Sequence, residues 1–453
     1  MKKYFSSYWF RSAFYSVLQR FSITLFGLIN FMVLIRTLSK TQMGTWALFL
    51  VVTSIFEQTK SSLLKNAHIR YVSSSGDSPE KTAIASASML INASITAIFV
   101  LIIIFFSDAI SRWLHTGDDL AGMLKWFIPG LVCMVLFSHL EAIQQSHLDF
   151  KGVFAGYFIR QVLFFGVIFV HTVMKIPFSL NLLAIYQSGC IVIGTIVIYF
   201  FSRPYILYRF DPTVEWLKKI LGFGGYIFSG GIMSNIFSNL DQIMTARFMP
   251  DSSSVAYYNA ATRINQVIDI PSFAAAEVLF PKASMASVDE GIDKVRYLYE
   301  RMVAVLLCFT VPTALFIILF PKLVITIIAG SKYAKAALIL QLYMITGILR
   351  PMQNQAANLL NSIGKARLCF IINAVSLAAN LIINYICLVN IGFYGAAIGT
   401  LITCILGTFS WYLVMRKQIG TKLSNIGVYM LDLYNILFRK ALTQVHKLKK
   451  ANS

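Results

Sequence analysis

The chain has 453 residues, of which 57% are hydrophobic and only 13% are charged, and its formal net charge is +20. A soluble domain carries roughly 25% charged residues, so this composition excludes a soluble protein and indicates one that crosses a membrane several times. Each spanning helix needs about 20 mainly apolar residues, which leaves room for about a dozen helices joined by short loops.

Apolar windows bounded by charges and turn residues predict twelve spans, six in each half of the chain. In the first half they cover residues 13–36, 42–64, 82–107, 121–143, 152–173 and 178–201. In the second half they cover residues 219–247, 253–281, 301–329, 335–362, 366–389 and 392–415. Arg11 and Arg20 interrupt the apolar core that a signal peptide needs, so we expect a cytoplasmic lead that the mature chain retains.

Lysine and arginine are concentrated in the segments that face the cytoplasm if the N-terminus is inside. The positive-inside rule therefore predicts that both termini are cytoplasmic, and it makes much of the net charge a membrane-surface signature. A nucleic-acid partner would need those charges on a folded soluble face, so none is expected. We expect an N-terminal six-helix bundle at residues 1–202, a cytoplasmic connector at 203–218, a C-terminal six-helix bundle at 219–415 and a basic tail at 416–453.

The two halves resemble each other at one turn. LIRTLSKTQMGTWAL, after the first span, and TARFMPDSSSVAYYNA, after the seventh, share an arginine, a short polar turn and a helix start with small and aromatic residues. Both halves have the same orientation, because six helices return the chain to its starting side. This is the parallel repeat of many transporters, which place their site between the halves.

The tail after the twelfth span is basic and amphipathic. Ile426, Met430, Leu433, Leu437 and Val445 fall near one helical stripe, with lysine and arginine elsewhere. This pattern predicts a helix that lies on the cytoplasmic membrane surface. The alternative is a partly disordered, solvated tail.

Several ionisable residues lie deep in the predicted spans, although a charge near the centre of a membrane helix costs about 2.5 to 3.5 kcal/mol. They are Arg20, Arg160, Asp241, Arg263, Asp269 and Arg350, with Glu57 and Lys60 nearer the cytoplasmic end of the second span. The arginines outnumber the acids, which favours a cavity for an anion. Arginine suits phosphate in particular, because its planar fork donates two parallel hydrogen bonds. We therefore expect Arg263 and Arg350 to bind substrate phosphate.

Polar residues follow these charges at helical spacing, which indicates that they line a cavity. The stripes are Asn259, Arg263 and Gln266 in the eighth span, Ser234, Ser238, Asp241 and Thr245 in the seventh, and Arg350, Asn354, Asn358 and Asn361 in the tenth. Pro351 is expected to bend the tenth helix.

Four of the deep charges also have structural interpretations. Glu57 and Lys60 are spaced at i and i+3 to pair with each other. Asp269 is spaced to be the counter-charge of Arg263. Arg160 has no polar stripe beyond Gln161, so its role is open between function and structure.

Two further charges have alternatives of their own. Arg20 is shallow enough to reach back to the cytoplasmic interface. Asp241 is either a proton or Na⁺ site, whose protonation changes with burial and with a neighbouring arginine, or one half of a structural ion pair. As a coupling acid, Asp241 would act together with Asp269.

With these residues in place, the sequence resembles the Wzx-type O-antigen flippases of the multidrug/oligosaccharidyl-lipid/polysaccharide (MOP) exporter superfamily, from about Ser12 to Met415. The resemblance rests on twelve spans in two sets of six and on the LIRTLSKTQMGTWAL turn. It also rests on LDQIMTARFMPDSSSVAYYNAATRI and on NLIINYICLVNIGFYGAAIGTLIT. In the last stretch, Gly392, Gly395, Ala396, Ala397 and Gly399 match the small residues with which the family begins helix twelve, where they allow close helix packing.

The resemblance implies a MATE-like fold of two bundles and a specific function. Such proteins move an undecaprenyl-pyrophosphate-linked oligosaccharide from the cytoplasmic to the periplasmic leaflet of the bacterial inner membrane by alternating access. By resemblance, Arg20 and Arg263 engage the pyrophosphate and Asp241 couples transport to H⁺ or Na⁺. Lys60 corresponds to a basic position in the second helix where related lipid flippases often have arginine, so the resemblance also implies Lys60 as a pyrophosphate ligand.

Other functions fit the sequence less well. A multidrug cation antiporter of the same superfamily would favour acids and aromatic residues in its cavity. A polysaccharide polymerase or ligase would need a large outer loop, and the longest outer stretch, SDAISRWLHTGDDLAGMLK, is short, with His115 in a solvated loop. A lipid II flippase usually has two further helices, whereas this tail offers only a short apolar-leaning stretch interrupted by Asp432, so we expect another branch. We expect no enzyme activity.

We also expect no cofactor or metal, because the six cysteines form no CxxC pair and the chain has no glycine-rich phosphate loop. The expected partners are a lipid-linked oligosaccharide, membrane lipids, H⁺ or Na⁺, and polysaccharide assembly proteins.

Overall fold

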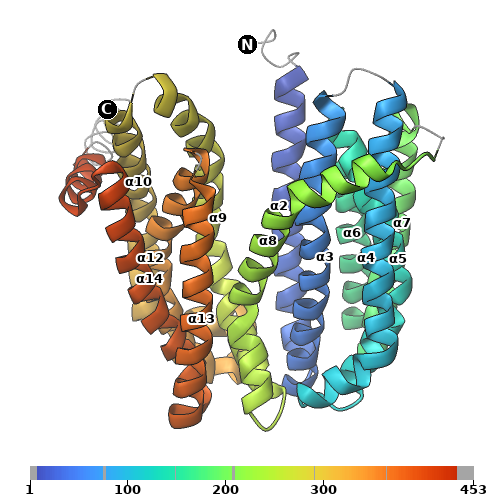
Figure 1. Cartoon of the computed structure of the whole chain (residues 1–453). Coiled ribbons are helices and arrows are strands. Elements are labelled where there is room, and N and C mark those ends of the chain that lie inside the picture. Colours follow the sequence, from blue (N-terminus) through green and yellow to red (C-terminus); the bar gives the residue numbers. More distant parts are fainter. Residues whose placement is uncertain are drawn as a thin grey trace, which may run out of the picture. The chain divides into compact units, whose positions relative to one another are not determined.

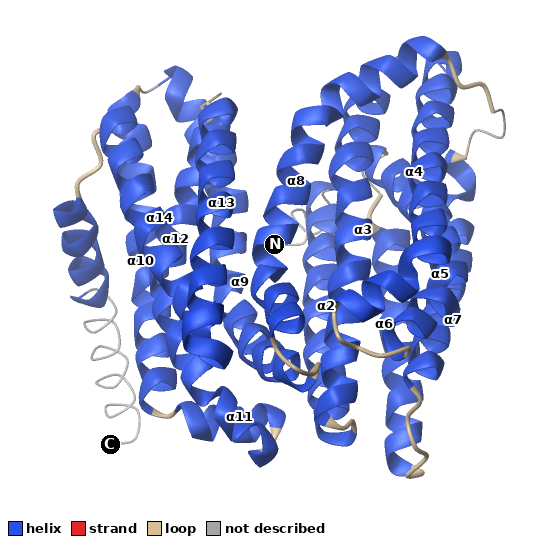
Figure 2. Ribbon diagram, turned by 60° about the horizontal axis from the view of Figure 1, so that its bottom comes forward, coloured by secondary structure: helices blue, strands red, loops and turns tan. Residues whose placement is uncertain are grey.

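The computed structural model describes residues 8–74, 78–147, 149–206, 210–289, 291–363 and 365–435. Every regular element within these ranges is helical, and Figure 2 shows no strand among them. The predicted all-α architecture is therefore confirmed. Contacts divide the chain into two compact units, residues 1–256 (unit 1) and 257–453 (unit 2).

Unit 1 holds the first seven long helices, in chain order (Figure 1). They are α2 (Tyr8–Thr37), α3 (Lys40–Ser74), α4 (Ser78–Trp113), α5 (Asp119–Ser146), α6 (Lys151–Val173), α7 (Leu180–Ser202) with the short 3-10 turn η1 (Arg203–Tyr205), and α8 (Val214–Phe248). Each of the seven coincides with a predicted span.

Helix α8 packs on α3 and α4, and its first part crosses them in Figure 1. Ile220 of α8 is fully buried in a cluster with Leu64 and Ala67 of α3 and Ala87 of α4. These contacts explain why α8 belongs to compact unit 1, whereas the sequence placed residues 219–247 in the second bundle. The division into two six-helix bundles stays a prediction.

The start of α3 and the turn after α8 contact each other, so the two turns that resemble each other in sequence meet in unit 1. Gly44 faces the Ser252 carbonyl so closely that a Cβ atom there would lie 1.7 Å from its oxygen. The Ser252 hydroxyl donates to the Thr41 carbonyl at 3.0 Å and lies 3.2 Å from the Thr45 hydroxyl. A side chain at Gly44 would separate the two segments.

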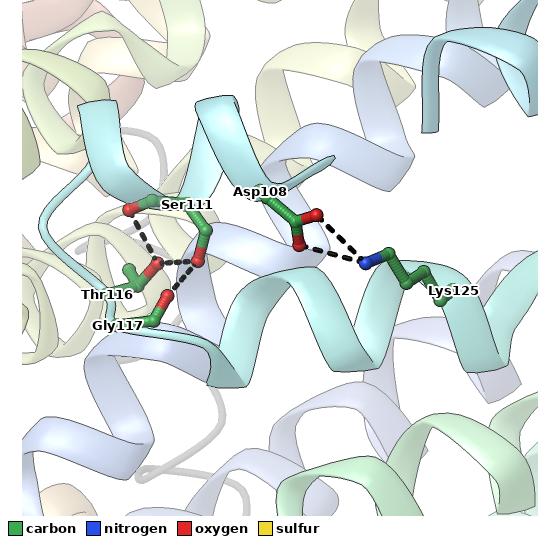
Figure 3. Close-up of polar contacts among 5 residues, drawn as sticks. All are labelled: Asp108, Ser111, Thr116, Gly117 and Lys125. Carbon is green, nitrogen blue, oxygen red and sulfur yellow. Dashed lines mark hydrogen bonds and ion pairs between the residues drawn. The ribbon is translucent and has the colours of Figure 1, made fainter. Parts of the chain in front are cut away.

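The turn between α4 and α5 is short, as the sequence indicated. Figure 3 shows the Thr116 hydroxyl bound to both the carbonyl and the hydroxyl of Ser111, at 3.1 and 2.8 Å. Next to this turn, Lys125 pairs with Asp108 at 2.9 Å. His115 is exposed but does more than face solvent, because its ring contacts the Ala246 carbonyl and Arg247, both on α8, at 3.2 and 3.3 Å.

Unit 2 holds the remaining helices. They are α9 (Ser253–Asp289, whose first turn lies in unit 1), α10 (Ile292–Leu319), α11 (Pro321–Ala329), the 3-10 element η2 (Ser331–Ala336), α12 (Ala337–Ser362), α13 (Ala366–Ile391), η3 (Gly392–Tyr394) and α14 (Gly395–Ile419). The predicted ninth span, residues 301–329, was wrong as one helix. Pro321 cannot continue a helix but suits its first position, so α10 ends before it and α11 begins there.

The small residues at the start of α14 allow close packing on α13, as predicted. A Cβ atom at Gly395 would lie 2.3 Å from the Cys387 carbonyl oxygen, and one at Gly399 would lie 2.2 Å from Oδ1 of Asn384. Asn384 donates to the Thr400 hydroxyl and to the Asn380 amide oxygen, both at 3.3 Å. The two helices are thus joined by backbone proximity and a buried polar contact.

Residues 423–435 form a further helix, here called the tail helix. Ile426 is buried in the same cluster as residues of α10 and α14, and Met430 and Leu433 pack against that cluster. These three residues therefore contact protein, which corrects the prediction that the stripe faces the membrane surface. Leu437 and Val445 lie outside the described residues.

Seven stretches within the described residues are long and apolar enough to cross a membrane. They are Phe14–Thr37, Pro79–Trp113, Asp119–Ser146, Lys151–Val173, Leu180–Tyr205, Ile292–Leu319 and Arg367–Ile419, the last of which runs through both α13 and α14. The chain is therefore a multi-pass membrane protein.

Candidate functional site

In unit 2, an ion pair joins α9 to α12. Nη1 of Arg350 lies 2.6 Å from Oδ2 of Asp269, in an ion pair whose side chains are 31% and 10% exposed. Asn265 lies one turn before Asp269, and its amide oxygen, when turned toward Arg350, accepts from both terminal nitrogens at 2.8 and 3.0 Å. One guanidinium thus has a carboxylate and an amide oxygen as acceptors.

Arg263 has a different environment. It is half-buried on α9, and its Nη1 donates to Oε1 of the exposed Gln266 at 3.5 Å. Among the described residues, no carboxylate pairs with it within 4 Å. The alternative that Asp269 is the counter-charge of Arg263 is wrong, because Asp269 pairs with Arg350. Arg263 therefore keeps donors available for an anion.

The other polar residues predicted for unit 2 lie on the same two helices. Asn259 is buried on α9, and Asn354 and Asn358 are half-buried on α12. The helices are tied together next to the ion pair, where Gln355 donates to the Ser272 carbonyl at 2.9 Å. Among the side chains that the structure describes on α9 and α12, two arginines and one carboxylate leave one positive charge over. A dianionic or trianionic head group is suited to such a surplus.

The residues predicted in unit 1 lie on four different helices, α2, α3, α6 and α8. Arg20 is exposed on α2, and Asp241 and Ser238 are half-buried and exposed, respectively, on α8. Arg160 of α6 is half-buried and donates to the Met134 sulfur at 3.5 Å. Its functional role stays open.

Lys60 lies instead in a cavity of about 290 Å³ that α3, α4, α5 and α6 enclose in unit 1. It is 4% exposed, and its ammonium donates to the Thr96 hydroxyl at 3.2 Å. Glu57 lines the same cavity, but within the described residues no ion pair joins it to Lys60, so the expected i, i+3 pair is absent. The buried Glu141 accepts from the Tyr157 hydroxyl at 3.1 Å.

Two histidines that sequence reasoning missed also line this cavity. His68 is 1% exposed, and neither ring nitrogen has a hydrogen-bond partner among the described residues. Its ring lies 5.5 Å from that of His139, edge to face. His68 lies beyond the apolar window that ended at residue 64, so the window hid it. Within the described part of the chain, no three metal-ligating side chains gather into a metal site.

Solved structures of membrane transporters share this multi-pass, all-helical fold. The lipid II flippase MurJ, in its inward closed conformation, aligns with a TM-score of 0.76 at 18% identity over 95% of this chain and 93% of that one. An inward-facing multidrug resistance MATE transporter of the MOP superfamily aligns with a TM-score of 0.77 at 15% identity over 87% and 94%. The predicted MATE-like fold is confirmed.

Sequence comparison identifies the protein family. The model of the family described as "Polysaccharide biosynthesis protein" matches residues 33–338, which is more than half of the chain. The chain belongs to this polysaccharide biosynthesis family.

Two curated relatives show the breadth of this family. The lipopolysaccharide biosynthesis protein WzxC of Escherichia coli K12 is 22% identical over 87% of this chain and 78% of its own length. An uncharacterized membrane protein of Methanocaldococcus jannaschii is 26% identical over 54% of this chain, and the match spans only about half (48%) of that relative.

Proposed function

We propose that the protein is a flippase. It moves a polyprenyl-pyrophosphate-linked oligosaccharide from the cytoplasmic to the periplasmic leaflet of a bacterial inner membrane, and it uses an H⁺ or Na⁺ gradient. It serves surface polysaccharide synthesis and makes or breaks no covalent bond. The names of WzxC and MurJ support the substrate class, because one is a lipopolysaccharide biosynthesis protein and the other a lipid II flippase.

The observation that carries the proposal is the guanidinium of Arg263 on α9, which has no carboxylate partner among the described residues. Arg263 is half-buried, and its described partner is the neutral amide of Gln266. A cation drug would be repelled there, whereas a pyrophosphate gains charge-assisted hydrogen bonds. Arg263 is thus the main pyrophosphate ligand, and Arg20 and Arg350 contribute further donors. Asp241 is the acid that couples transport to the ion gradient.

The test is complementation of a host that lacks this gene. Leaflet location of the glycan lipid is read by its accessibility to an external glycan-cleaving enzyme. In the deletion strain we expect the complete glycan lipid to accumulate where the external enzyme cannot cleave it. The wild-type gene should make the glycan lipid accessible to that enzyme again. Arg263→Ala should reduce flipping by about tenfold or more, since it removes charge-assisted hydrogen bonds. Arg263→Lys keeps the charge but loses the planar guanidinium, so its flipping activity should lie between that of the wild type and that of Arg263→Ala.

Arg367→Ala is the matched control, because Arg367 is an exposed arginine near the start of α13. It should complement fully. Asp241→Asn should block flipping driven by the ion gradient while leaving pyrophosphate binding intact. If glycan lipids are unchanged by deletion, the substrate class is wrong and export of cationic drugs becomes the function to test.

A further inference from the structure

Arg350 already holds the kind of group that it would bind on a substrate. Its guanidinium is in contact with one carboxylate oxygen of Asp269 at 2.6 Å and with the Asn265 amide oxygen at 2.8 and 3.0 Å. A planar guanidinium recognises carboxylate and phosphate with the same geometry, two parallel N–H donors to two oxygens. Asp269 therefore occupies the place of a phosphate on Arg350.

The local packing holds this carboxylate close to Arg350. Asp269 and Asn265 lie one turn apart on α9, and Gln355 of α12 ties the same part of α9 to α12 through the Ser272 carbonyl. The Asp269 side chain is only 10% exposed, and within the described residues Arg350 is its one ion-pair partner. The carboxylate thus returns to Arg350 whenever no stronger anion is there.

We propose that Asp269 and the pyrophosphate head group compete for Arg350, so that Asp269 loosens bound substrate and resets Arg350 after the lipid leaves. This inference rests on the proposed function, because it needs a pyrophosphate at α9 and α12. Arg263, which has no carboxylate partner in the described chain, captures the anion first. Arg350 joins only when the anion displaces Asp269, so total affinity stays low enough for release.

Competition and a purely structural role predict opposite signs. If Asp269 only supported the fold, its loss would leave Arg350 as an uncompensated buried charge and weaken everything that depends on α12. If Asp269 competes, its loss makes Arg350 available and tightens anion binding. A bound pyrophosphate that is held too tightly also leaves slowly, so turnover falls while affinity rises.

The experiment measures binding of farnesyl pyrophosphate to the purified full-length protein in lipid nanodiscs, with inorganic pyrophosphate as a second probe. Asp269→Asn keeps the shape of the side chain and should bind about tenfold or more tightly than wild type. Asp269→Glu keeps the charge and should bind like wild type. Tighter binding of both probes identifies the phosphates as the competing group. Tightening of farnesyl pyrophosphate alone would overturn the proposal, because it would trace the effect to the isoprenyl chain.

Two further variants complete the test. Asp108→Asn is the matched control, because Asp108 is an aspartate in an exposed pair with Lys125 in unit 1 (Figure 3), and its loss should not change affinity. Arg350→Ala should abolish the gain from Asp269→Asn when the two are combined, since the competition acts through Arg350. Melting temperatures of all variants show whether each is folded.

Three further outcomes would overturn the proposal. Equal or weaker binding by a folded Asp269→Asn protein refutes competition. A gain that persists without Arg350 shows that Asp269 acts elsewhere. If neither probe binds to wild type or to any variant, the anion-transport function itself fails, and the inference fails with it.

Discussion

The contact between the start of α3 and the turn after α8 yields a clear stability prediction. Glycine-to-alanine changes inside helices usually stabilise, but Gly44→Ala should destabilise. The new Cβ would lie 1.7 Å from the Ser252 carbonyl oxygen and 2.5 Å from its carbon, whereas real Cβ contacts essentially never fall below 3.0 Å. Both atoms belong to backbone, so no flexible side chain can absorb the clash.

The loss of stability can be worked out from the contacts that the new methyl group would break. Overpacking typically costs about 1 to 3 kcal/mol. Moving Ser252 also disrupts its hydroxyl contacts with Thr41 and Thr45, worth about 1 kcal/mol each. We therefore expect the free energy of unfolding to fall by about 2 to 4 kcal/mol, measured by denaturation in mixed detergent micelles.

Gly189→Ala is the matched control in the same unit. Gly189 lies inside α7, and a Cβ atom there would have nothing within 4 Å, so alanine should stabilise by about 0.5 to 1 kcal/mol. Opposite signs at the two sites support the close approach. If Gly44→Ala is as stable as Gly189→Ala, the α3 start does not contact the Ser252 carbonyl and the packing of unit 1 is wrong there.

Two buried charges give further predictions. Glu300 of α10 is 1% exposed and accepts from the Lys422 N–H at 2.8 Å and from the Asn425 amide at 2.9 Å. Glu300→Gln should lower the free energy of unfolding by about 1.5 to 3 kcal/mol and speed hydrogen exchange in the tail helix. Unchanged exchange there would show that this carboxylate does not hold the tail helix in place. Lys60→Met removes the ammonium that binds the Thr96 hydroxyl and shares its cavity with Glu57 and Glu141, and it should lower the free energy of unfolding by about 1 to 3 kcal/mol. Adding Glu57→Gln should restore part of that loss, and no recovery would mean that Lys60 and Glu57 do not interact across the cavity.

Sequence patterns predicted the helices well because apolar length is a local property. They failed at residues 301–329, where averaging over a window concealed Pro321, a residue that ends one helix and begins the next. The tail shows a second limit. The stripe through Ile426, Met430 and Leu433 was real, but spacing identifies a helical face and not its partner, which is α10 and α14 rather than lipid.

The site was predictable residue by residue but not as a set of contacts. Helical spacing suggested Arg263 as the partner of Asp269, because both lie on one helix, whereas the true partner lies 81 positions away on α12. Asn265 could have been found, since it precedes Asp269 by one turn and shares its face. His68 could not have been predicted from the sequence, because only the packing of α3 against α5 brings it to a cavity.

The distribution of polarity among the helices supports one physical interpretation of the whole molecule. Four of the long helices, α3, α8, α9 and α12, carry the deep ionisable residues Lys60, Asp241, Arg263 and Arg350, respectively. A buried charge in a membrane protein must be compensated or used. Arg350 is compensated by Asp269, and Lys60 shares its cavity with carboxylates. Arg263 has no carboxylate partner within the described residues, which is why we propose it as the main ligand of the substrate anion.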